Sequence, residues 1–102
     1  MKAVRVQYTV KKEYVEKNKE NIVKVMNDLR QINNPGIKYS TFLLDNGHTF
    51  MHLAIFKNEE ANRVFSEVES FKQFTAELKA SEPVSSPKVE NLTLVGASYD
   101  IF

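Results

Sequence analysis

The residues best suited to chemistry in this chain are its two histidines, His48 and His52. In a strand, four steps of ~3.3 Å separate their Cα atoms by roughly 13 Å, too far for both to bind one metal ion through bonds of ~2 Å. His48 follows the glycine of a predicted turn, which is typical of a solvated loop residue. His52 lies within an apolar run. It is therefore either a hydrogen-bonded core residue or, because imidazole titrates near neutrality, a proton shuttle or an anchor for a ligand hydroxyl.

Two further polar candidates, Arg5 and Gln7, share the polar side of the first predicted strand. If that side meets a partner, the guanidinium must be paired, because an unpartnered buried charge is prohibitively costly. We predict either an intersubunit hydrogen-bond or ion-pair network or, for Arg5, stabilisation of an anionic substrate such as a phenolate or enolate.

Aromatic side chains are the remaining candidates. Strand tyrosines usually pack through the ring and keep the hydroxyl wet, although one could serve as a base or a ligand anchor. The phenylalanines at helical spacing are core residues, and they would form the wall of a pocket if one exists. The predicted substrate-binding residues are therefore Arg5, Gln7, Tyr39, Tyr99, Phe65, Phe71 and Phe74.

Composition narrows the class of protein. The 102 residues fit a single domain, 1–102, and 42% hydrophobic with 26% charged residues is typical of a globular fold. A net charge of +1 provides no field that would attract nucleic acid or a membrane surface. With no cysteine, no glycine-rich phosphate loop and no carboxylate cluster, we predict neither a metal nor a cofactor. The lack of a secretory signal and of ~20 consecutive apolar residues predicts a cytoplasmic location away from membranes.

The elements that must position these residues follow from hydrophobic periodicity. Alternation over 3–10 predicts a strand, and apolar residues at helical spacing from about Glu13 to Ile32 predict an amphipathic helix. Asn33-Asn34-Pro35-Gly36 ends that helix, because proline cannot continue it and glycine permits the reversal. Two apolar runs, 37–44 and 49–56, flank Asp45-Asn46-Gly47, which predicts a hairpin.

A second helical region spans 58–80, with a change of phase at Glu69-Ser70 that predicts two short helices or a kink. The segment 81–88 holds Pro83 and Pro87 among serines and is predicted to be a loop. The β-branched and aromatic run 92–102 is predicted to be the last strand, with Gly96 at a bulge.

The predicted order β-α-β-β-α-β is that of the α+β ferredoxin-like fold, a four-stranded antiparallel sheet with both helices on one face. Both sides of the strand 49–56 are largely apolar, so the side that the helices leave uncovered would be a large exposed apolar patch. We therefore predict that a second copy of the chain covers it.

Several of these residues occur in a recognisable sequence pattern. Pro35-Gly36 with Tyr39 follows the first helix, Phe56 ends the third strand, and the last helix carries the pair Phe71 and Phe74. In these features the chain resembles the antibiotic-biosynthesis-monooxygenase (ABM) type of dimeric α+β barrel. The resemblance implies a homodimer paired sheet to sheet, with a small apolar pocket between sheet and helices in each subunit.

Members of that family include cofactor-free oxygenases of quinol-like and polyketide substrates and haem-degrading enzymes. The chain has no tryptophan and no histidine between Ser70 and Ala80, so it departs from the Asn, Trp and His set of the haem-degrading members. The resemblance thus implies a cofactor-independent monooxygenase or else a non-catalytic ligand-binding or sensor dimer. For the first of these we predict His52 as the catalytic residue, with His52 or a tyrosine acting as base or ligand anchor. RNA binding, a third use of this topology, is disfavoured because the strand 49–56 lacks the basic residue and glycines of an RNA-recognition motif.

Overall fold

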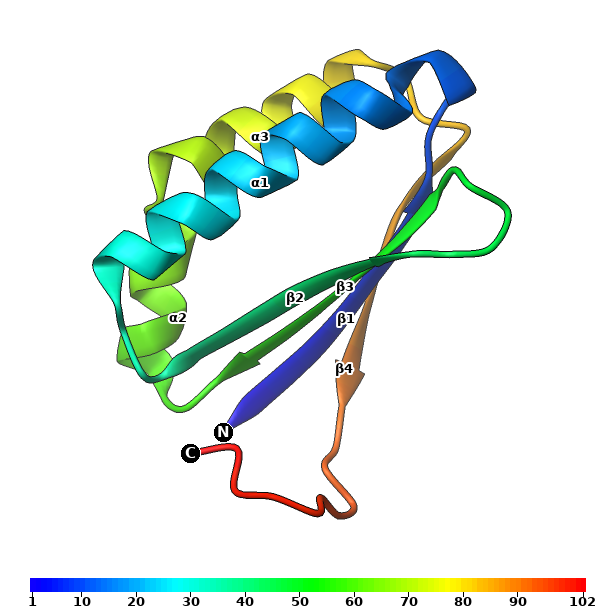
Figure 1. Cartoon of the computed structure of the whole chain (residues 1–102). Helices are drawn as coiled ribbons and strands as arrows, with labels where there is room; N and C mark the ends of the chain where they lie inside the picture. Colours follow the sequence, from blue (N-terminus) through cyan, green and yellow to red (C-terminus); the bar gives the residue numbers. More distant parts are fainter.

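The computed structural model describes residues 1–102 as a four-stranded antiparallel sheet with helices on one face (Figure 1). The sheet order is β2-β3-β1-β4, so β1 and β3 are central and the open sheet has β2 and β4 at its edges. This arrangement confirms the predicted ferredoxin-like fold. No helix combines the length and the apolar character needed to cross a membrane. The elements are β1 (Lys2–Thr9), α1 (Val15–Ile32), β2 (Ile37–Leu43), β3 (Thr49–Phe56), α2 (Glu59–Ser66), α3 (Glu69–Ala80) and β4 (Ser85–Leu92), with a 3-10 turn at Lys12–Tyr14.

The end of α1 and the hairpin turn between β2 and β3 lie where the sequence predicts them. Asn33 ends α1 in the left-handed conformation with φ 53°, and its N–H donates to the Leu29 carbonyl at 3.0 Å. In the hairpin, Gly47 takes φ 82°, while the Asn46 side-chain oxygen accepts from the backbone N–H of His48 and of Thr49. These local bonds fix how β2 and β3 meet.

The second helical region divides into α2 and α3, as its change of phase predicts. The break lies at Glu67 and Val68, just before the predicted Glu69-Ser70. Asn58 caps α2, because its side-chain oxygen accepts from the Ala61 N–H at 2.9 Å. The break lets α2 and α3 cover different parts of the sheet (Figure 1).

The predicted last strand at 92–102 is wrong. The strand β4 is Ser85–Leu92, so it begins inside the predicted loop 81–88 and ends where the predicted strand begins. Residues 93–102, including the predicted bulge at Gly96, have no regular structure. Every residue of β4 is exposed, so this edge strand is held by backbone pairing to β1 rather than by an apolar face. Pro87 is tolerated because it lies at an edge, where the register with β1 shifts between Gln7 and Thr9.

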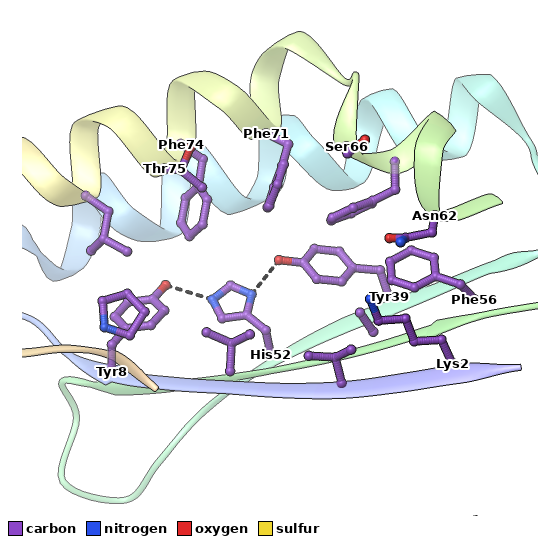
Figure 2. Close-up of a pocket in the computed structure, with 16 residues that line it drawn as sticks. Lys2, Tyr8, Tyr39, His52, Phe56, Asn62, Ser66, Phe71, Phe74 and Thr75 are labelled. Atoms are coloured by element: carbon purple, nitrogen blue, oxygen red, sulfur yellow. Dashed lines mark hydrogen bonds between the residues drawn. The ribbon is translucent and has the colours of Figure 1, made fainter. Parts of the chain in front are cut away.

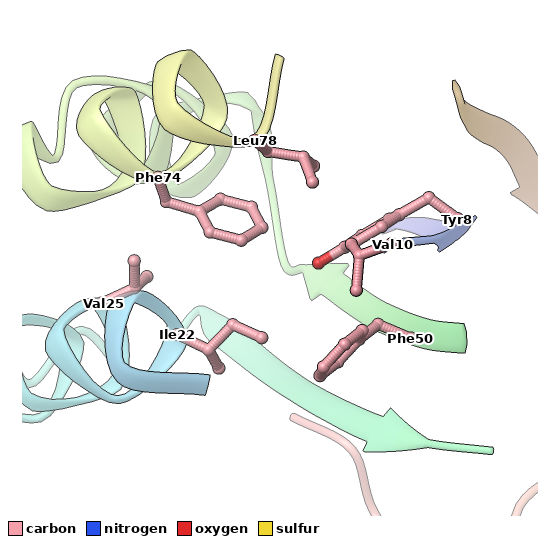
Figure 3. Close-up of a cluster of buried hydrophobic side chains, with 7 residues drawn as sticks. All are labelled: Tyr8, Val10, Ile22, Val25, Phe50, Phe74 and Leu78. Carbon is pink, nitrogen blue, oxygen red and sulfur yellow. The ribbon is translucent and has the colours of Figure 1, made fainter. Parts of the chain in front are cut away.

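The sheet face that packs on the helices carries Phe50, His52, Ala54 and Phe56 of β3, all of them buried. The core is divided into two clusters. One joins β1 and β3 to α1 and α3, as Figure 3 shows, and the other joins β3 to α2. The first consists of Tyr8, Val10, Ile22, Val25, Phe50, Phe74 and Leu78, and the second of Ala54, Phe56, Ala61 and Phe65.

Two valines of α1 provide a matched test of this core. Val25 is 1% exposed, whereas Val23, two positions earlier, is 54% exposed. We expect Val25→Ala to lower the free energy of unfolding by about 2 kcal/mol, because it leaves a cavity, and Val23→Ala to change it by less than about 0.5 kcal/mol. Urea denaturation measures both, and equal effects would contradict the placement of the α1 face.

Candidate functional site

A cavity of about 310 Å³ lies between the helix-facing side of the sheet and helices α2 and α3 (Figure 2). Its floor is formed by β1, β2 and β3, and its roof by the helices. It lies where the two core clusters meet, and the half-buried Tyr39 and Phe71 pack against both clusters. Small-molecule sites usually measure ~300–1,000 Å³, so this one suits a small ligand.

His52 occupies the middle of the cavity floor, and the strand register decides its neighbours. It lies opposite Val6 on β1 and opposite Thr41 on β2. Tyr8 and Tyr39 occupy diagonal positions on those two strands, opposite Phe50 and Ala54. Diagonal neighbours on one sheet face lie within reach of long aromatic side chains. The pairing therefore brings one tyrosine to each side of the imidazole.

Both ring nitrogens of His52 are hydrogen-bonded. Its Nε2 lies 2.7 Å from the Tyr8 hydroxyl, and its Nδ1 lies 2.6 Å from the Tyr39 hydroxyl (Figure 2). The Thr41 hydroxyl lies 2.9 Å from the same Nδ1. From α1, the Asn18 side-chain N–H donates to the Tyr8 hydroxyl oxygen at 2.9 Å. Asn18, Tyr8, His52 and Tyr39 form a continuous line, hereafter the polar array, that runs from α1 across three strands.

Burial keeps the polar array neutral. It lowers the pKa of His52 from 6.5 to about 4, because a buried imidazolium loses its hydration. Burial also raises the pKa values of the Tyr8 and Tyr39 phenols above their usual range, despite the hydrogen bonds from Asn18 and Thr41. At neutral pH the cavity thus offers an uncharged imidazole and two protonated phenols.

Aromatic rings hold the polar array in place. Tyr8 and Tyr39 stack on the imidazole with ring centroids at 5.3 and 5.6 Å, and Phe74 tilts over it at 5.5 Å. Phe65 packs against Tyr39 at 4.9 Å and against Phe71 at 4.4 Å. The remaining polar lining residues lie away from the imidazole; they are Lys2, Asn62, Ser66 and Thr75 (Figure 2).

The structure brings together five of the predicted site residues: His52, Tyr39, Phe65, Phe71 and Phe74. It places Arg5 and Gln7 on the opposite face of the sheet, where they hydrogen-bond each other and Arg5 lies 3.8 Å from the Glu90 carboxylate. Tyr99 is 71% exposed and lies in the C-terminal segment, where it lines a cleft together with Leu53 and Ile55. These three residues do not line the cavity.

Sequence reasoning missed three members of the site. Tyr8 is absent from the predicted site residues, because the sequence does not reveal which residue of a neighbouring strand lies diagonal to His52. Thr41 is also absent from them, although it lies directly opposite His52 in the strand register. Asn18 interrupts the apolar stripe of α1, four positions before Ile22, and is 0% exposed. An amide on the buried face of a helix was the signal that could have found it, since buried polar groups need partners.

Several solved structures with this architecture are described as antibiotic biosynthesis monooxygenases or cofactor-independent oxygenases. The chain superimposes on a crystal structure of an antibiotic biosynthesis monooxygenase with a TM-score of 0.78 at 16% identity, covering 94% of this chain and 100% of the other. A candidate antibiotic biosynthesis monooxygenase from Caulobacter crescentus gives 0.77 at 15% identity, covering 93% and 90%. A mutant of SnoaB, a cofactor-independent oxygenase from Streptomyces nogalater, gives 0.72 at 12% identity, covering 97% of both.

These likenesses show that the chain has the ABM-like fold that its sequence pattern resembles. No protein-family model and no curated relative matches it. At such identities the fold carries over but the activity does not. Nowhere in residues 1–102 do three histidine, aspartate or glutamate side chains converge as metal ligands would.

The lowered pKa of His52 makes folding depend on pH. The unfolded chain takes up a proton near pH 6.5, whereas the folded chain resists protonation down to about pH 4, so stability falls as the pH falls through this window. The full difference corresponds to about 3 kcal/mol. We expect urea denaturation to show this loss in the wild type and in the control His48→Gln, but not in His52→Gln. An unchanged pH slope in His52→Gln would contradict the buried, neutral imidazole.

Proposed function

We propose that the protein is a homodimer that binds a small, mostly apolar molecule in each cavity and acts as a cofactor-independent monooxygenase on a quinol-like or polyketide aromatic. The observation that supports this proposal best is the pairing of one neutral polar array with aromatic walls in a cavity of about 310 Å³. Flat aromatic substrates match such walls, and a single oxygen on the ligand would match the hydroxyl of Tyr39.

The reaction we propose needs no external reductant. Loss of a proton from a phenol or enol of the substrate gives an electron-rich, carbanion-like ring carbon. A CH₂ at that carbon reacts with dioxygen, gains one oxygen atom and becomes a carbonyl, while its two hydrogens leave with the second oxygen atom as water. All four electrons come from the substrate. The role of the cavity is to hold the substrate oxygen and to exclude water.

His52 and Tyr39 are the residues placed to act on that oxygen, either by taking its proton or by stabilising the negative charge left on it. A charge that develops beside the imidazole would itself favour the protonated ring, because opposite charges attract strongly in a dry site. Both roles depend on His52.

The alternative is ligand binding without catalysis by the same dimer. It is favoured by the internal bonding of His52, whose two nitrogens are both engaged by protein hydroxyls and whose pKa is lowered to about 4. An imidazole in that state suits an anchor better than a base.

The dimer is proposed from the face of the sheet opposite the helices. Leu53 and Ile55 are only half-buried there, and Phe42 is 53% exposed. No helix covers this face, and the C-terminal residues 99–101 only border a cleft over Leu53 and Ile55. The C-terminal segment also exposes Leu94 and Val95. A face of this kind is unfavourable in water, and a second copy would cover it. The predicted partner role of Arg5 and Gln7 belongs to this same face.

The activity is tested by oxygen consumption with anthrone and with 1,4-dihydroxynaphthalene, each corrected for its spontaneous oxidation. We expect protein-dependent consumption, and we expect His52→Ala to lower it by roughly 10²-fold or more, because the polar array loses its centre. His48→Ala is the matched control, with near wild-type activity. Wild-type protein that binds these compounds without consuming oxygen would favour the non-catalytic alternative. Full activity in His52→Ala would exclude a catalytic role for His52.

The dimer is tested by sedimentation of wild type and of two matched variants. Leu53→Glu places a carboxylate on the proposed interface, where its burial would be costly, so we expect it to shift the equilibrium toward monomer. Val23→Glu makes the same kind of change on the exposed side of α1 and should leave the dimer intact. A monomeric wild type at micromolar concentration would refute the proposed assembly.

A further inference from the structure

The hydrogen bonds of the Tyr8 hydroxyl determine which ring nitrogen of His52 carries the hydrogen. That hydroxyl has one hydrogen to donate, and its partners in the structure are Asn18 and His52. Asn18 uses its amide N–H as the donor, so it cannot accept the Tyr8 hydrogen. Only His52 Nε2 remains as an acceptor for it.

The imidazole is neutral and so carries one hydrogen. If Nε2 held it, the Tyr8 oxygen would accept from both sides, and its own hydrogen would be buried without an acceptor, which is costly. If Nδ1 holds the hydrogen, the Tyr8 hydroxyl and both ring nitrogens of His52 are satisfied: the Asn18 amide N–H donates to Tyr8, Tyr8 donates to Nε2, and Nδ1–H points toward β2.

The consequence falls on Tyr39. The nearest oxygen to Nδ1 is the Tyr39 hydroxyl at 2.6 Å, with that of Thr41 at 2.9 Å. The Tyr39 oxygen accepts from Nδ1–H and from the Thr41 hydroxyl, and neither of these bonds uses the hydrogen of Tyr39 itself. Tyr39 lines the cavity, so that hydrogen is free to donate to a bound molecule.

We propose that Asn18 is a positioning residue that sets the direction of the whole polar array, so that Tyr39 presents an O–H donor to the ligand. The proposal rests on the proposed ligand-binding function and deepens it: the ligand offers an acceptor oxygen there, as a ketone, enolate or phenolate. Asn18 touches no ligand and acts through Tyr8 and His52. The polar array then stabilises negative charge on the ligand oxygen instead of removing a proton.

The direction of the polar array is measured by ¹⁵N NMR of the His52 ring in the ligand-free wild type, since protonated and unprotonated ring nitrogens differ widely in chemical shift. We expect the hydrogen on Nδ1. In Asn18→Asp the carboxylate accepts from Tyr8, and the hydrogen should move to Nε2. Asn18→Leu introduces no buried charge, so it serves as the second variant if Asn18→Asp does not fold. In Asn18→Leu we expect a mixture of molecules with the hydrogen on Nδ1 and molecules with it on Nε2. A wild-type hydrogen on Nε2, or an Nδ1 hydrogen unchanged in the folded variants, would overturn the proposal.

The ligand arm compares 1-tetralone with tetralin, which lacks only the carbonyl oxygen. The wild type should bind the ketone roughly three- to tenfold more tightly than tetralin, and Tyr39→Phe and Asn18→Asp should lose this preference. Equal affinities in the wild type would overturn the donor role of Tyr39. Failure of both compounds to bind would instead count against the proposed ligand-binding function, while the ligand-free spectra still decide the role of Asn18.

Discussion

A neutral imidazole buried at the centre of the sheet is the constraint on which the rest of this molecule depends. A buried ring of this kind needs a partner at each nitrogen, because an unsatisfied polar group in a dry interior costs ~1–3 kcal/mol. His52 meets this need through one hydroxyl from each neighbouring strand, Tyr8 and Tyr39. The antiparallel order β2-β3-β1 is therefore a requirement of the site as well as the frame of the fold.

The cavity follows from the way in which the helices cover that sheet. The break at Glu67 and Val68 divides the second helical region, so that α3 packs with α1 over one end of the sheet and α2 packs over the other. Two separate core clusters result, and the space between them is bridged by Tyr39 and Phe71. A single unbroken helix would direct all its apolar residues along one line and would not divide the core in this way.

Periodicity was sufficient to predict most of the fold from the sequence, because β1, α1 and the hairpin each bury one face. It failed for β4, whose exposed residues carry no apolar alternation, and the apolar residues after Leu92 drew the prediction to the wrong segment. In the site, His52 and Tyr39 were predictable from strand alternation. For Arg5 and Gln7 the sequence left open an intersubunit network or a substrate role, because both faces of β3 are apolar, which hides the side on which the helices lie. The contact of Asn18 with Tyr8 depends on packing between a helix and a strand, which no local pattern encodes.

The two faces of β1 satisfy polar groups in different ways. On the helix side, Tyr8 belongs to a line of neutral groups that leads to the cavity. On the opposite side, Arg5 pairs with Gln7 and Glu90 among half-buried apolar neighbours, and its Nε has no partner. A guanidinium that already has local partners can enter an interface at a smaller cost than a free one. The proposed second subunit would pack against β1 from that side. Strand β1 carries Tyr8, and its pairing with β3 positions His52. On this account the assembly and the polar array depend on the same strand.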